Sequence, residues 1–349
     1  MVAVRSPAGT GAAVADGTES LRVVVTDPII SRFEDLLKSD GGAHRWDMAA
    51  AWTPERKLDA LAGADVVVCS SLNAAEAAAA QRARLVHVTG AGYDKISFPH
   101  LAPAAAVANT FHHARPIAEH VLMVTLMLSR NVAASDRALR NGQWKTIATD
   151  GGVPFHPVLA DLTLGLVGLG SIGAEVARVA GSLGMKVRAV RRNPAAPLPP
   201  GVSPDWVGGH DELHALLAAS DVVVVTVPLD AGTEGMIGRA ELDAMKPSAF
   251  LINVARGPVV DQAALYAALK GGDIAGAGLD VWWGLPADGV VPPAELPFGS
   301  LPNTVLTPHH SGHARMTFER RAADIAANIA LLASGGELQN VVRRPVPAK

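Results

Sequence analysis

The sequence predicts an α/β fold made of two doubly wound parallel-sheet domains. Segments 64–70 and 220–228 each hold an unbroken apolar run, which is typical of strands buried on both faces of a sheet. Helix-compatible segments separate such runs, and this alternation favours parallel strands with helices on both sides. With 349 residues, 49% of them hydrophobic, the chain can fill two cores. The likeness of the two segments suggests similar domains, although buried parallel strands also resemble one another in unrelated sheets.

The first predicted domain follows residues 1–20, which are small and polar and lack the apolar core of a signal peptide. We interpret them as a disordered leader. The runs that follow predict strands over 21–25, 64–70 and 85–88, helices over 29–38 and from Asn73, and a glycine turn at 90–94.

A long helix is predicted to join the two domains. Pro116 suits its first turn, and the pair Asn141 and Gly142 would end it. Segment 142–161 is irregular, with several glycines and prolines. Beyond it we predict strands at 186–190, 220–228, 249–257, 274–281 and 303–310, and a final helix over 316–333 that stops at Gly335.

A glycine motif lies between a strand and a helix in segment 162–193. The pattern GxGxxG is formed by Gly168, Gly170 and Gly173. In this setting the glycines permit a tight turn, a close approach of backbone to a pyrophosphate, and close packing of helix on strand. The alternative is a glycine-rich turn in an ordinary α/β protein. We predict a Rossmann-like dinucleotide site, with the phosphates at the helix N-terminus beside Ser171 and Ile172.

Composition narrows the class of partner. A net charge of −3 leaves no basic field for nucleic acid, and the apolar stretch 121–128 is too short to span a bilayer. The single cysteine, Cys69, excludes intramolecular disulfides and cysteine-based zinc clusters. We therefore predict a cytoplasmic protein that acts on a small molecule without a metal site.

Ionisable side chains follow several predicted strands. Arg256, Asp280 and His309 each lie at the carboxyl end of a strand, where open α/β sheets bind their ligands. With these residues, the chain closely resembles the D-isomer-specific 2-hydroxyacid dehydrogenase family from about residue 21 to residue 342. The motifs that carry the resemblance are GAGYD, AEH at 118–120, GLGSIG, TVPL, MKPSAFLINVARGPVVD, GLDV and TPH.

The resemblance implies a domain organisation and an activity. Residues 21–114 and 316–349 would form the substrate domain, and residues 115–315, including a hinge helix over 115–142, would form the NAD(P)-binding domain. The active site would lie in the cleft between the domains. The implied reaction is hydride transfer between NAD(P)H and a 2-oxoacid/D-2-hydroxyacid pair, with reduction the expected direction. A homodimer formed through the nucleotide-binding domain is also implied.

The resemblance also implies roles for particular residues. Arg256 would bind the substrate carboxylate and polarise the C2 carbonyl, since a guanidinium is always charged and pairs with a carboxylate through two hydrogen bonds. His309 would be the general acid/base, because imidazole titrates near neutrality. His310 and His313 would be flanking residues. The substrate would also contact Ser71, Leu72 and Gly92, and the cofactor would contact Val227, Pro228, Thr233, Val254, Ala255, Asp280 and His309.

The sequence departs from the family pattern near its histidine. Family members carry a glutamate that orients the catalytic histidine and raises its pKa, and Leu285 stands at that position. Leucine can do neither, so acid catalysis should weaken unless Asp280 or Glu295 substitutes. Trp282 and Trp283 either wall the cleft or serve ordinary packing. Asn109, His112 and His113 precede the predicted hinge helix and receive no assigned role.

A second departure concerns the cofactor. The strand after the glycine motif ends in Arg191 and Arg192, where an acidic residue would bind the 2′-hydroxyl of NAD. Adjacent arginines suit the 2′-phosphate of NADP, so we predict a preference for NADP over NAD. The alternative is a pair of ordinary surface arginines.

Two further functions stay open at the sequence level. Oxidation of a small anion, such as formate or phosphite, is one of them. However, formate dehydrogenases of this fold carry glutamine where Leu285 stands. The other is an NAD(P)-binding regulator that has lost efficient catalysis, against which the presence of both Arg256 and His309 argues.

Overall fold

The computed structural model describes residues 19–40, 42–284 and 294–346. Contacts divide the chain into two units. Unit 1 joins the chain up to Phe111 with the chain from Phe318 onward, and unit 2 is His112–Thr317. Most of the predicted leader, 1–20, lies outside the described residues.

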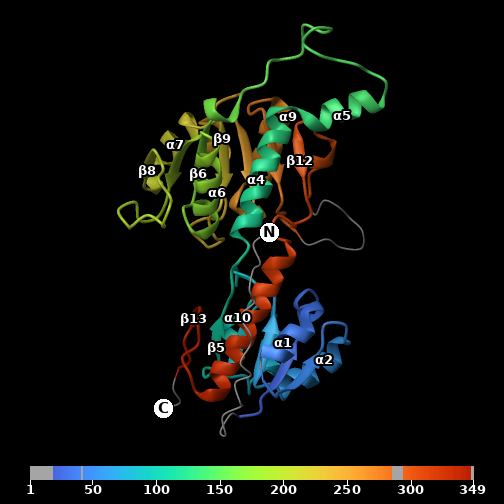
Figure 1. The fold of residues 1–349 in the computed structure, drawn as a ribbon, viewed down its shortest axis with the longest axis vertical. Helices are drawn as coiled ribbons and strands as arrows, with labels where there is room; N and C mark the ends of the chain where they lie inside the picture. The colour runs from blue at the N-terminus through green and yellow to red at the C-terminus, as the bar shows by residue number, and fades with distance from the viewer. Residues whose placement is uncertain (1–18, 41, 285–293, 347–349) are drawn as a thin grey trace, which may run out of the picture. The chain divides into compact units, whose positions relative to one another are not determined.

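Unit 1 is built on a sheet with the order β13-β5-β4-β3-β1-β2. Figure 1 labels its strands β5 and β13. All neighbouring strands are parallel except β13, which pairs antiparallel with β5. The chain order reverses at β1, so the switch point of this doubly wound sheet lies between β1 and β3. The strands are β1 (Arg22–Val25), β2 (Arg45–Met48), β3 (Val66–Cys69), β4 (Leu85–Val88), β5 (Ala106–Ala108) and β13 (Val341–Arg343).

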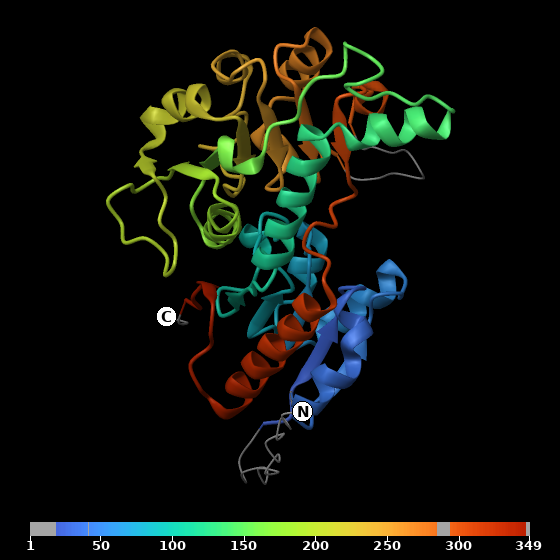
Figure 2. The same ribbon diagram turned by 45° about the horizontal axis from the view of Figure 1, so that its top comes forward.

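Helices cover both faces of the unit 1 sheet because its central strands are apolar on both sides. Helix α10 (Arg315–Ser334) lies along one face (Figure 2) and packs Ile325 and Ile329 against Val23 and Val25. The opposite face packs against α2 and α3. Asn73 forms a capping box with Glu76 at the start of α3, as its position before an alanine-rich run predicts. The other elements are η1 (Ile30–Phe33), α1 (Glu34–Asp40), α2 (Pro54–Ala62), α3 (Ala74–Ala79) and η2 (Phe98–His100).

Unit 2 contains an all-parallel sheet with the order β12-β11-β10-β9-β6-β7-β8. Its switch point lies between β6 and β9, directly beside the glycine motif. The prediction of two doubly wound parallel sheets is therefore confirmed. The strands are β6 (Thr163–Val167), β7 (Lys186–Val190), β8 (Trp206–Gly208), β9 (Val222–Val225), β10 (Phe250–Asn253), β11 (Gly276–Leu279) and β12 (Thr304–Leu306).

The predicted continuous helix over 115–142 is wrong. The chain forms α4 (Ala114–Ser129) and α5 (Val132–Arg140), separated by Asn131 with φ of +52°. A left-handed residue cannot continue a right-handed helix, and asparagine adopts that conformation more readily than most residues. The other helical elements of unit 2 are η3 (Leu159–Asp161), α6 (Ser171–Ser182), η4 (His210–Glu212), α7 (Leu213–Ala219), α8 (Arg239–Asp243), η5 (Gly257–Val259), α9 (Gln262–Gly271) and η6 (Phe298–Ser300).

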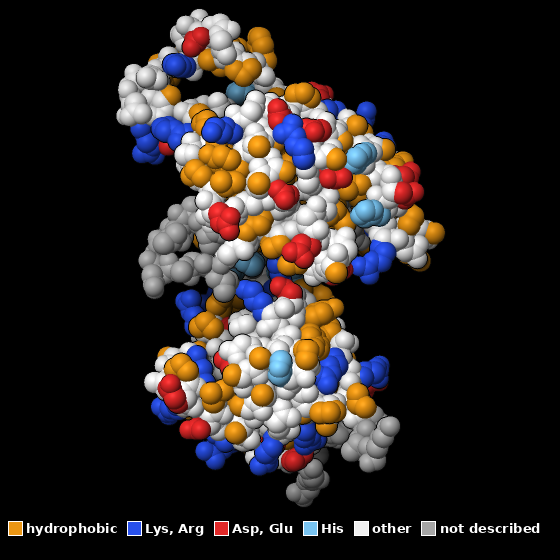
Figure 3. All heavy atoms as spheres, turned by 180° about the vertical axis from the view of Figure 1, so that it is seen from behind, with side chains coloured by type: hydrophobic (Ala, Val, Ile, Leu, Met, Phe, Trp, Pro, Cys, Tyr) orange, Lys and Arg blue, Asp and Glu red, His pale blue; other side chains and the backbone are white. Residues whose placement is uncertain are grey.

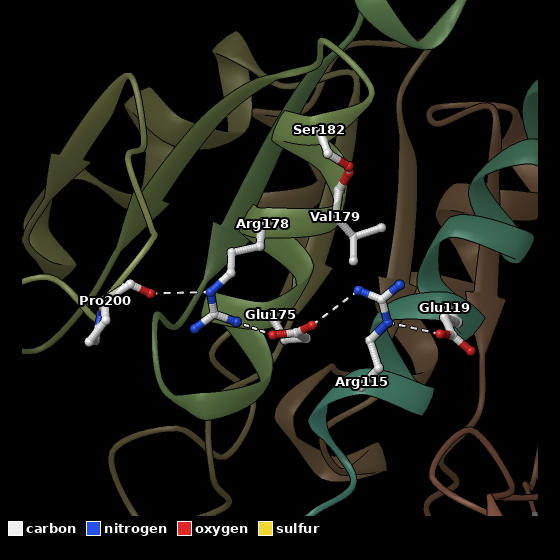
Figure 4. A network of polar contacts seen from close by, with 7 residues as sticks. All are labelled: Arg115, Glu119, Glu175, Arg178, Val179, Ser182 and Pro200. Atoms are coloured by element: carbon white, nitrogen blue, oxygen red, sulfur yellow. Dashed lines mark hydrogen bonds and ion pairs between the residues drawn. The ribbon is translucent and has the colours of Figure 1, made fainter. Parts of the chain in front are cut away.

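Helices α4 and α6 are joined by a chain of charged side chains (Figure 4). Arg115 bonds Glu119 on its own helix at 2.8 Å and Glu175 on α6 at 3.3 Å. Glu175 also pairs with Arg178, whose Nε donates to the Pro200 carbonyl at 3.2 Å. Helix α6 is thereby tied at its surface as well as through its buried face.

The surface fits the near-neutral charge of the chain. On the face drawn in Figure 3, basic and acidic side chains are interspersed. None of the helices in the described part of the chain has the length and hydrophobicity needed to cross a membrane.

Candidate functional site

The turn after β6 is built by its glycines. Gly168 adopts φ of +105°, which side chains disfavour. A Cβ at Gly173 would lie 2.3 Å from the Gly168 carbonyl oxygen, so only glycine lets α6 pack this closely. The Thr226 hydroxyl, from the end of β9, donates to the same carbonyl at 2.9 Å. These contacts fix the turn at the switch point of the sheet.

Gly170 differs from the other two glycines. It is the N-cap residue of α6, and a Cβ placed on it would meet nothing within 4 Å. The N-terminus of α6, at Ser171 and Ile172, therefore has open space before it. Backbone N–H groups and the helix dipole favour an anion there. The turn fits the pyrophosphate of a dinucleotide.

The two arginines after β7 have different surroundings. Arg191 donates from Nη1 to the Pro197 carbonyl at 3.2 Å and from Nη2 to the Pro194 and Ala196 carbonyls. Its side chain thus holds the loop that follows the strand. Arg192 is 85% exposed and pairs with Asp230 at 3.2 Å. Of the two guanidiniums, that of Arg192 is the more accessible to a ligand.

The loop after β9 is held by Thr233, which is buried. Its hydroxyl donates to the Pro228 carbonyl at 2.6 Å and accepts from the Asp230 amide at 2.8 Å. Val227 contributes to the packing of the glycine turn, since a Cβ on Gly168 would lie 3.0 Å from its Cγ1. Val227 thus lies beside the glycine motif, and Thr233 fixes the loop that follows it.

Arg256 follows β10 in a turn made by Asn253. The fully buried Asn253 amide group donates to the Arg256 carbonyl at 2.9 Å and accepts from the Ala255 amide at 3.0 Å. A Cβ on Gly257 would lie 2.2 Å from the Trp282 backbone, so the chain must pass here without a side chain. The buried Val254 and Ala255 anchor the turn from within, which leaves Arg256 partly exposed.

Asp280 follows β11 and is buried, with its carboxylate directed at the chain after β12. It accepts from the Thr307 hydroxyl at 2.6 Å and from the amides of His310 and Ser311, both at 3.0 Å. Burial acts to raise the pKa of Asp280, but the hydrogen bonds from Ser311 and Thr307 outweigh it and lower the pKa. The carboxylate is therefore charged at neutral pH and fixes the loop that carries His309.

His309 is exposed and has φ of +56°. Side chains rarely adopt this conformation, and such outliers cluster where the surrounding structure imposes them. Here the next two amides are held by Asp280. His309 thus lies at the carboxyl edge of the unit 2 sheet. Arg256, Asp280 and His309 follow the neighbouring strands β10, β11 and β12 in that order.

His120, the last residue of the AEH motif, belongs to this cluster, although the sequence assigned it no role. Its Nε2 lies 3.4 Å from the Thr307 hydroxyl oxygen, and its ring meets that of His310 edge-on with centroids 5.8 Å apart. Because the Thr307 hydroxyl donates to Asp280, Nε2 of His120 must be the donor to Thr307. Burial lowers the pKa of His120, against the opposing effect of Asp280, so the ring is neutral at pH 7.

Three further expectations concern the chain beside this loop. Trp282 donates from Nε1 to the Thr307 carbonyl at 3.0 Å, and Trp283 stacks on Phe298 with centroids 5.2 Å apart. Both contacts support the packing interpretation of these tryptophans. Glu295 is exposed, and Leu285 lies outside the described residues.

In unit 1, the predicted substrate residues lie at the carboxyl ends of β3 and β4. Ser71 and Gly92 are exposed, whereas Leu72 is buried. The Leu72 amide donates to the Lys95 carbonyl at 3.0 Å. That N–H is already satisfied within the protein, and a substrate contact of Leu72 stays a prediction.

Asn109, His112 and His113 received no role from the sequence. The contacts described for them support the fold. Asn109 is buried and donates to the Ala91 carbonyl at 2.7 Å, which holds the glycine turn after β4. The His112 carbonyl accepts from Thr317, and His113 is buried beside Gly312.

The chain matches known proteins over most of its length. The family model described as D-isomer specific 2-hydroxyacid dehydrogenase, NAD binding domain, matches residues 122–311. A glyoxylate reductase of Korarchaeum cryptofilum is 36% identical over 279 residues, which are 77% of this chain and 78% of the relative. A glycerate dehydrogenase of Methylorubrum extorquens is 32% identical over 300 residues, which are 84% of this chain and 90% of the relative.

Solved structures agree with this match. A D-isomer specific 2-hydroxyacid dehydrogenase from Xanthobacter autotrophicus, solved in complex with NADPH and MES, has a TM-score of 0.74 and 28% identity, and covers 93% of this chain and 98% of its own. Together with the glycine turn and the edge formed by β10, β11 and β12, these likenesses identify the protein. The chain belongs to the D-isomer-specific 2-hydroxyacid dehydrogenase family and is an NAD(P)-dependent oxidoreductase of 2-oxoacids and D-2-hydroxyacids.

Proposed function

We propose that the chain reduces a small 2-oxoacid with NADPH, using His309 as the acid and Arg256 as the group that binds and polarises the substrate. The observation that carries the proposal is the shared edge of β10, β11 and β12, where Arg256 and His309 flank the Asp280 anchor. The names of the relatives, glyoxylate reductase and glycerate dehydrogenase, support a short substrate. Nothing in these names favours formate or phosphite oxidation.

The mechanism assigns each residue one task. The nicotinamide cofactor, when bound, supplies the hydride that reaches C2 of the oxoacid. The Arg256 guanidinium pairs with the substrate carboxylate and stabilises the negative charge that develops on the carbonyl oxygen. His309 donates its ring proton to that oxygen and removes it in the reverse direction. Asp280 does not transfer a proton, because its carboxylate holds the backbone of residues 310 and 311.

We further propose that NADPH is preferred over NADH through Arg192. The Arg191 guanidinium donates to carbonyls of its own loop and so positions that loop. Arg192 is exposed and lies near the end of β7. A guanidinium there attracts a 2′-phosphate. The complex of the Xanthobacter relative with NADPH is consistent with this choice. In Arg192→Ala we expect kcat/KM for NADPH to fall about tenfold with that for NADH nearly unchanged.

The proposal is tested by initial rates at the nicotinamide absorbance band. NADPH and NADH are compared in parallel against glyoxylate, hydroxypyruvate, pyruvate, phenylpyruvate and a branched 2-oxoacid. We expect the highest kcat/KM with NADPH and the two smallest polar substrates. Equal or better turnover with NADH would refute the cofactor preference, and a preference for the bulky oxoacids would refute the substrate class.

We also propose that the chain forms a homodimer through the segment that follows α4, from α5 to Val158. This segment carries large apolar side chains at high exposure: Leu139 57%, Trp144 72%, Phe155 85% and Val158 51%. Such a concentration on a monomer surface is typical of a protein interface. Sedimentation of the wild type and of a Trp144→Ser, Phe155→Ser variant is the test, with a dimer expected only for the wild type. Residence in the cytoplasm stays a prediction from the single, buried Cys69.

A further inference from the structure

Arg321 of α10 stands out among the charged residues of unit 1. It is partly buried, and its Nε donates to the Phe111 carbonyl at 2.8 Å. Its guanidinium also lies over the Phe318 ring, 5.4 Å from the centroid. Among the described residues, no carboxylate lies within ion-pair distance of it, and its two Nη atoms donate no hydrogen bond. A partly buried cation whose hydrogen-bonding fork has no protein partner is suited to bind an anion.

The carboxylate that acts electrostatically on Arg321, that of Asp27, is already engaged in other hydrogen bonds. Asp27, buried just after β1, accepts the Ile29 and Ile30 amides on one oxygen, both at 2.8 Å, and the Thr89 hydroxyl on the other at 2.7 Å. Burial lowers the pKa of Arg321 to about 10, with Asp27 acting in the opposite direction. Arg321 therefore stays charged at neutral pH. Asp27 contributes long-range attraction without occupying the guanidinium fork.

Arg321 reaches the carboxyl edge of the unit 1 sheet. A Cβ placed on Gly90, which follows β4, would lie 3.9 Å from its Nη1, and Asp27, which follows β1, attracts it electrostatically. The switch point of the unit 1 sheet is between β1 and β3, and open α/β sheets bind ligands there at the carboxyl edge. The exposed Ser71, after β3, belongs to the same edge. Glycine at position 90 leaves the guanidinium uncovered by a side chain from that loop.

We propose that Arg321 is a substrate-binding residue of unit 1 whose guanidinium fork holds a carboxylate of the 2-oxoacid. This inference rests on the proposed reduction of 2-oxoacids. The carboxylate has two possible sources: the one next to the reacting carbonyl, or a second one at the far end of a dicarboxylic substrate. A guanidinium binds either through two parallel hydrogen bonds.

The test compares Arg321→Met and Arg321→Lys with Arg320→Met. Arg320 is the exposed neighbour on the same helix, so its replacement removes the same charge without touching the site. We expect kcat/KM of Arg321→Met to fall about 10- to 100-fold, mostly through KM, with Arg321→Lys between it and the wild type and Arg320→Met unchanged. A fall with glyoxylate and 2-oxoglutarate alike assigns the reacting carboxylate. A fall with 2-oxoglutarate alone assigns the distal one.

A binding measurement separates this inference from the proposed activity. Oxalate should raise the thermal unfolding temperature of the wild type and of Arg320→Met, and should raise that of Arg321→Met much less. This readout needs no turnover, so it remains decisive if the wild type reduces none of the oxoacids. An Arg321→Met enzyme that matches Arg320→Met in kcat/KM for every substrate, or in the oxalate shift, would overturn the proposal.

Discussion

The carboxyl edges of the two sheets are built in different ways. In unit 2, the turns after β6, β10 and β12 are fixed by backbone contacts with glycine, Asn253 and Asp280, so few polar groups of these anchors are left for a ligand. In unit 1, the edge carries an exposed glycine turn and a cation, Arg321, that arrives from α10 near the end of the chain. The unit 2 edge is made rigid by its own loops, whereas the positive charge at the unit 1 edge comes from a helix distant in sequence.

This difference has a functional meaning. Hydride transfer requires the reacting groups to be held in fixed geometry, and rigid backbone anchors provide it. Substrate choice requires only a suitable charge and shape, which a single side chain can supply or change. We infer that changes at the unit 2 edge affect kcat and stability together, whereas changes at the unit 1 edge affect KM.

The largest effect is expected from Asp280→Asn. The amide cannot accept from all three donors, so the loop carrying His309 loses its anchor, and we expect kcat to fall about 100-fold and stability by about 3 kcal/mol. Asp221→Asn is the matched control, since Asp221 binds Lys246 and the Thr163 amide at the opposite edge of the same sheet. Steady-state kinetics should show the loss only in Asp280→Asn. A kcat within twofold of the wild type would contradict the role given to Asp280.

Two substitutions in the glycine turn should affect different properties, one thermal stability and the other cofactor binding. Gly173→Ala places a Cβ 2.3 Å from a backbone oxygen, and we expect it to destabilise unit 2 by about 1 to 3 kcal/mol. Gly170→Ala meets nothing within 4 Å, so it should leave thermal stability intact while weakening cofactor binding. Thermal unfolding and cofactor titration distinguish the two. Equal destabilisation by both would show that the turn is not built as described.

A buried histidine makes unit 1 sensitive to acid. Burial lowers the pKa of His87 to about 4, and its Nε2 lies 2.9 Å from Asn328 Nδ2. The unfolded state, with a pKa near 6.5, binds the proton first, so stability falls as pH drops below about 6.5 and the loss is complete below about 4.

We expect a loss of about 2 kcal/mol between pH 7 and pH 5 from this residue. The variant His87→Gln keeps an acceptor for Asn328 but does not titrate, so its stability should change less over this range. Thermal unfolding at both pH values measures the difference. If the two proteins lose stability in parallel, His87 is not the source.

The smallest effect is expected from the surface chain between α4 and α6. Arg115→Ala breaks ion pairs with Glu119 and Glu175, whereas Arg140→Ala breaks only the pair with Asp136 on its own helix. Exposed pairs contribute little, so we expect the unfolding temperature to change by about 1 °C for Arg115→Ala and less for Arg140→Ala. Added salt should reduce the difference. A larger change in Arg140→Ala would contradict the assigned link.

Features with a local cause could be predicted from the sequence. The buried apolar strands and the glycine turn are examples, because burial on both faces and a steric need for glycine leave a pattern in consecutive residues. The short strands β2, β5, β8 and β13 were missed, since strands of three or four residues, some at sheet edges, leave little pattern. The break at Asn131 was missed for a related reason, because the predicted stop at Gly142 also fitted the end of a helix.

Features that depend on distant residues could not be predicted. Asp280 was expected near the site, but its hydrogen bonds to residues 310 and 311 depend on the adjacency of β11 and β12. The engagement of the Leu72 amide by Lys95 and of Arg191 by its own loop likewise has no sequence signature. Arg321 is one arginine among several in a helix, and only the fold brings it to the Phe111 carbonyl and to the loop at Gly90.

We propose that the unit 2 edge performs acid-assisted hydride transfer to a 2-oxoacid. The most direct test is the rate of glyoxylate-dependent NADPH oxidation by the wild type and by His309→Ala, with cofactor binding measured for both. We predict turnover by the wild type, a loss of about 10²- to 10⁴-fold in kcat for His309→Ala, and NADPH binding that is retained in both proteins. Equal rates in the two proteins, or no turnover by a wild type that binds NADPH, would contradict the claim.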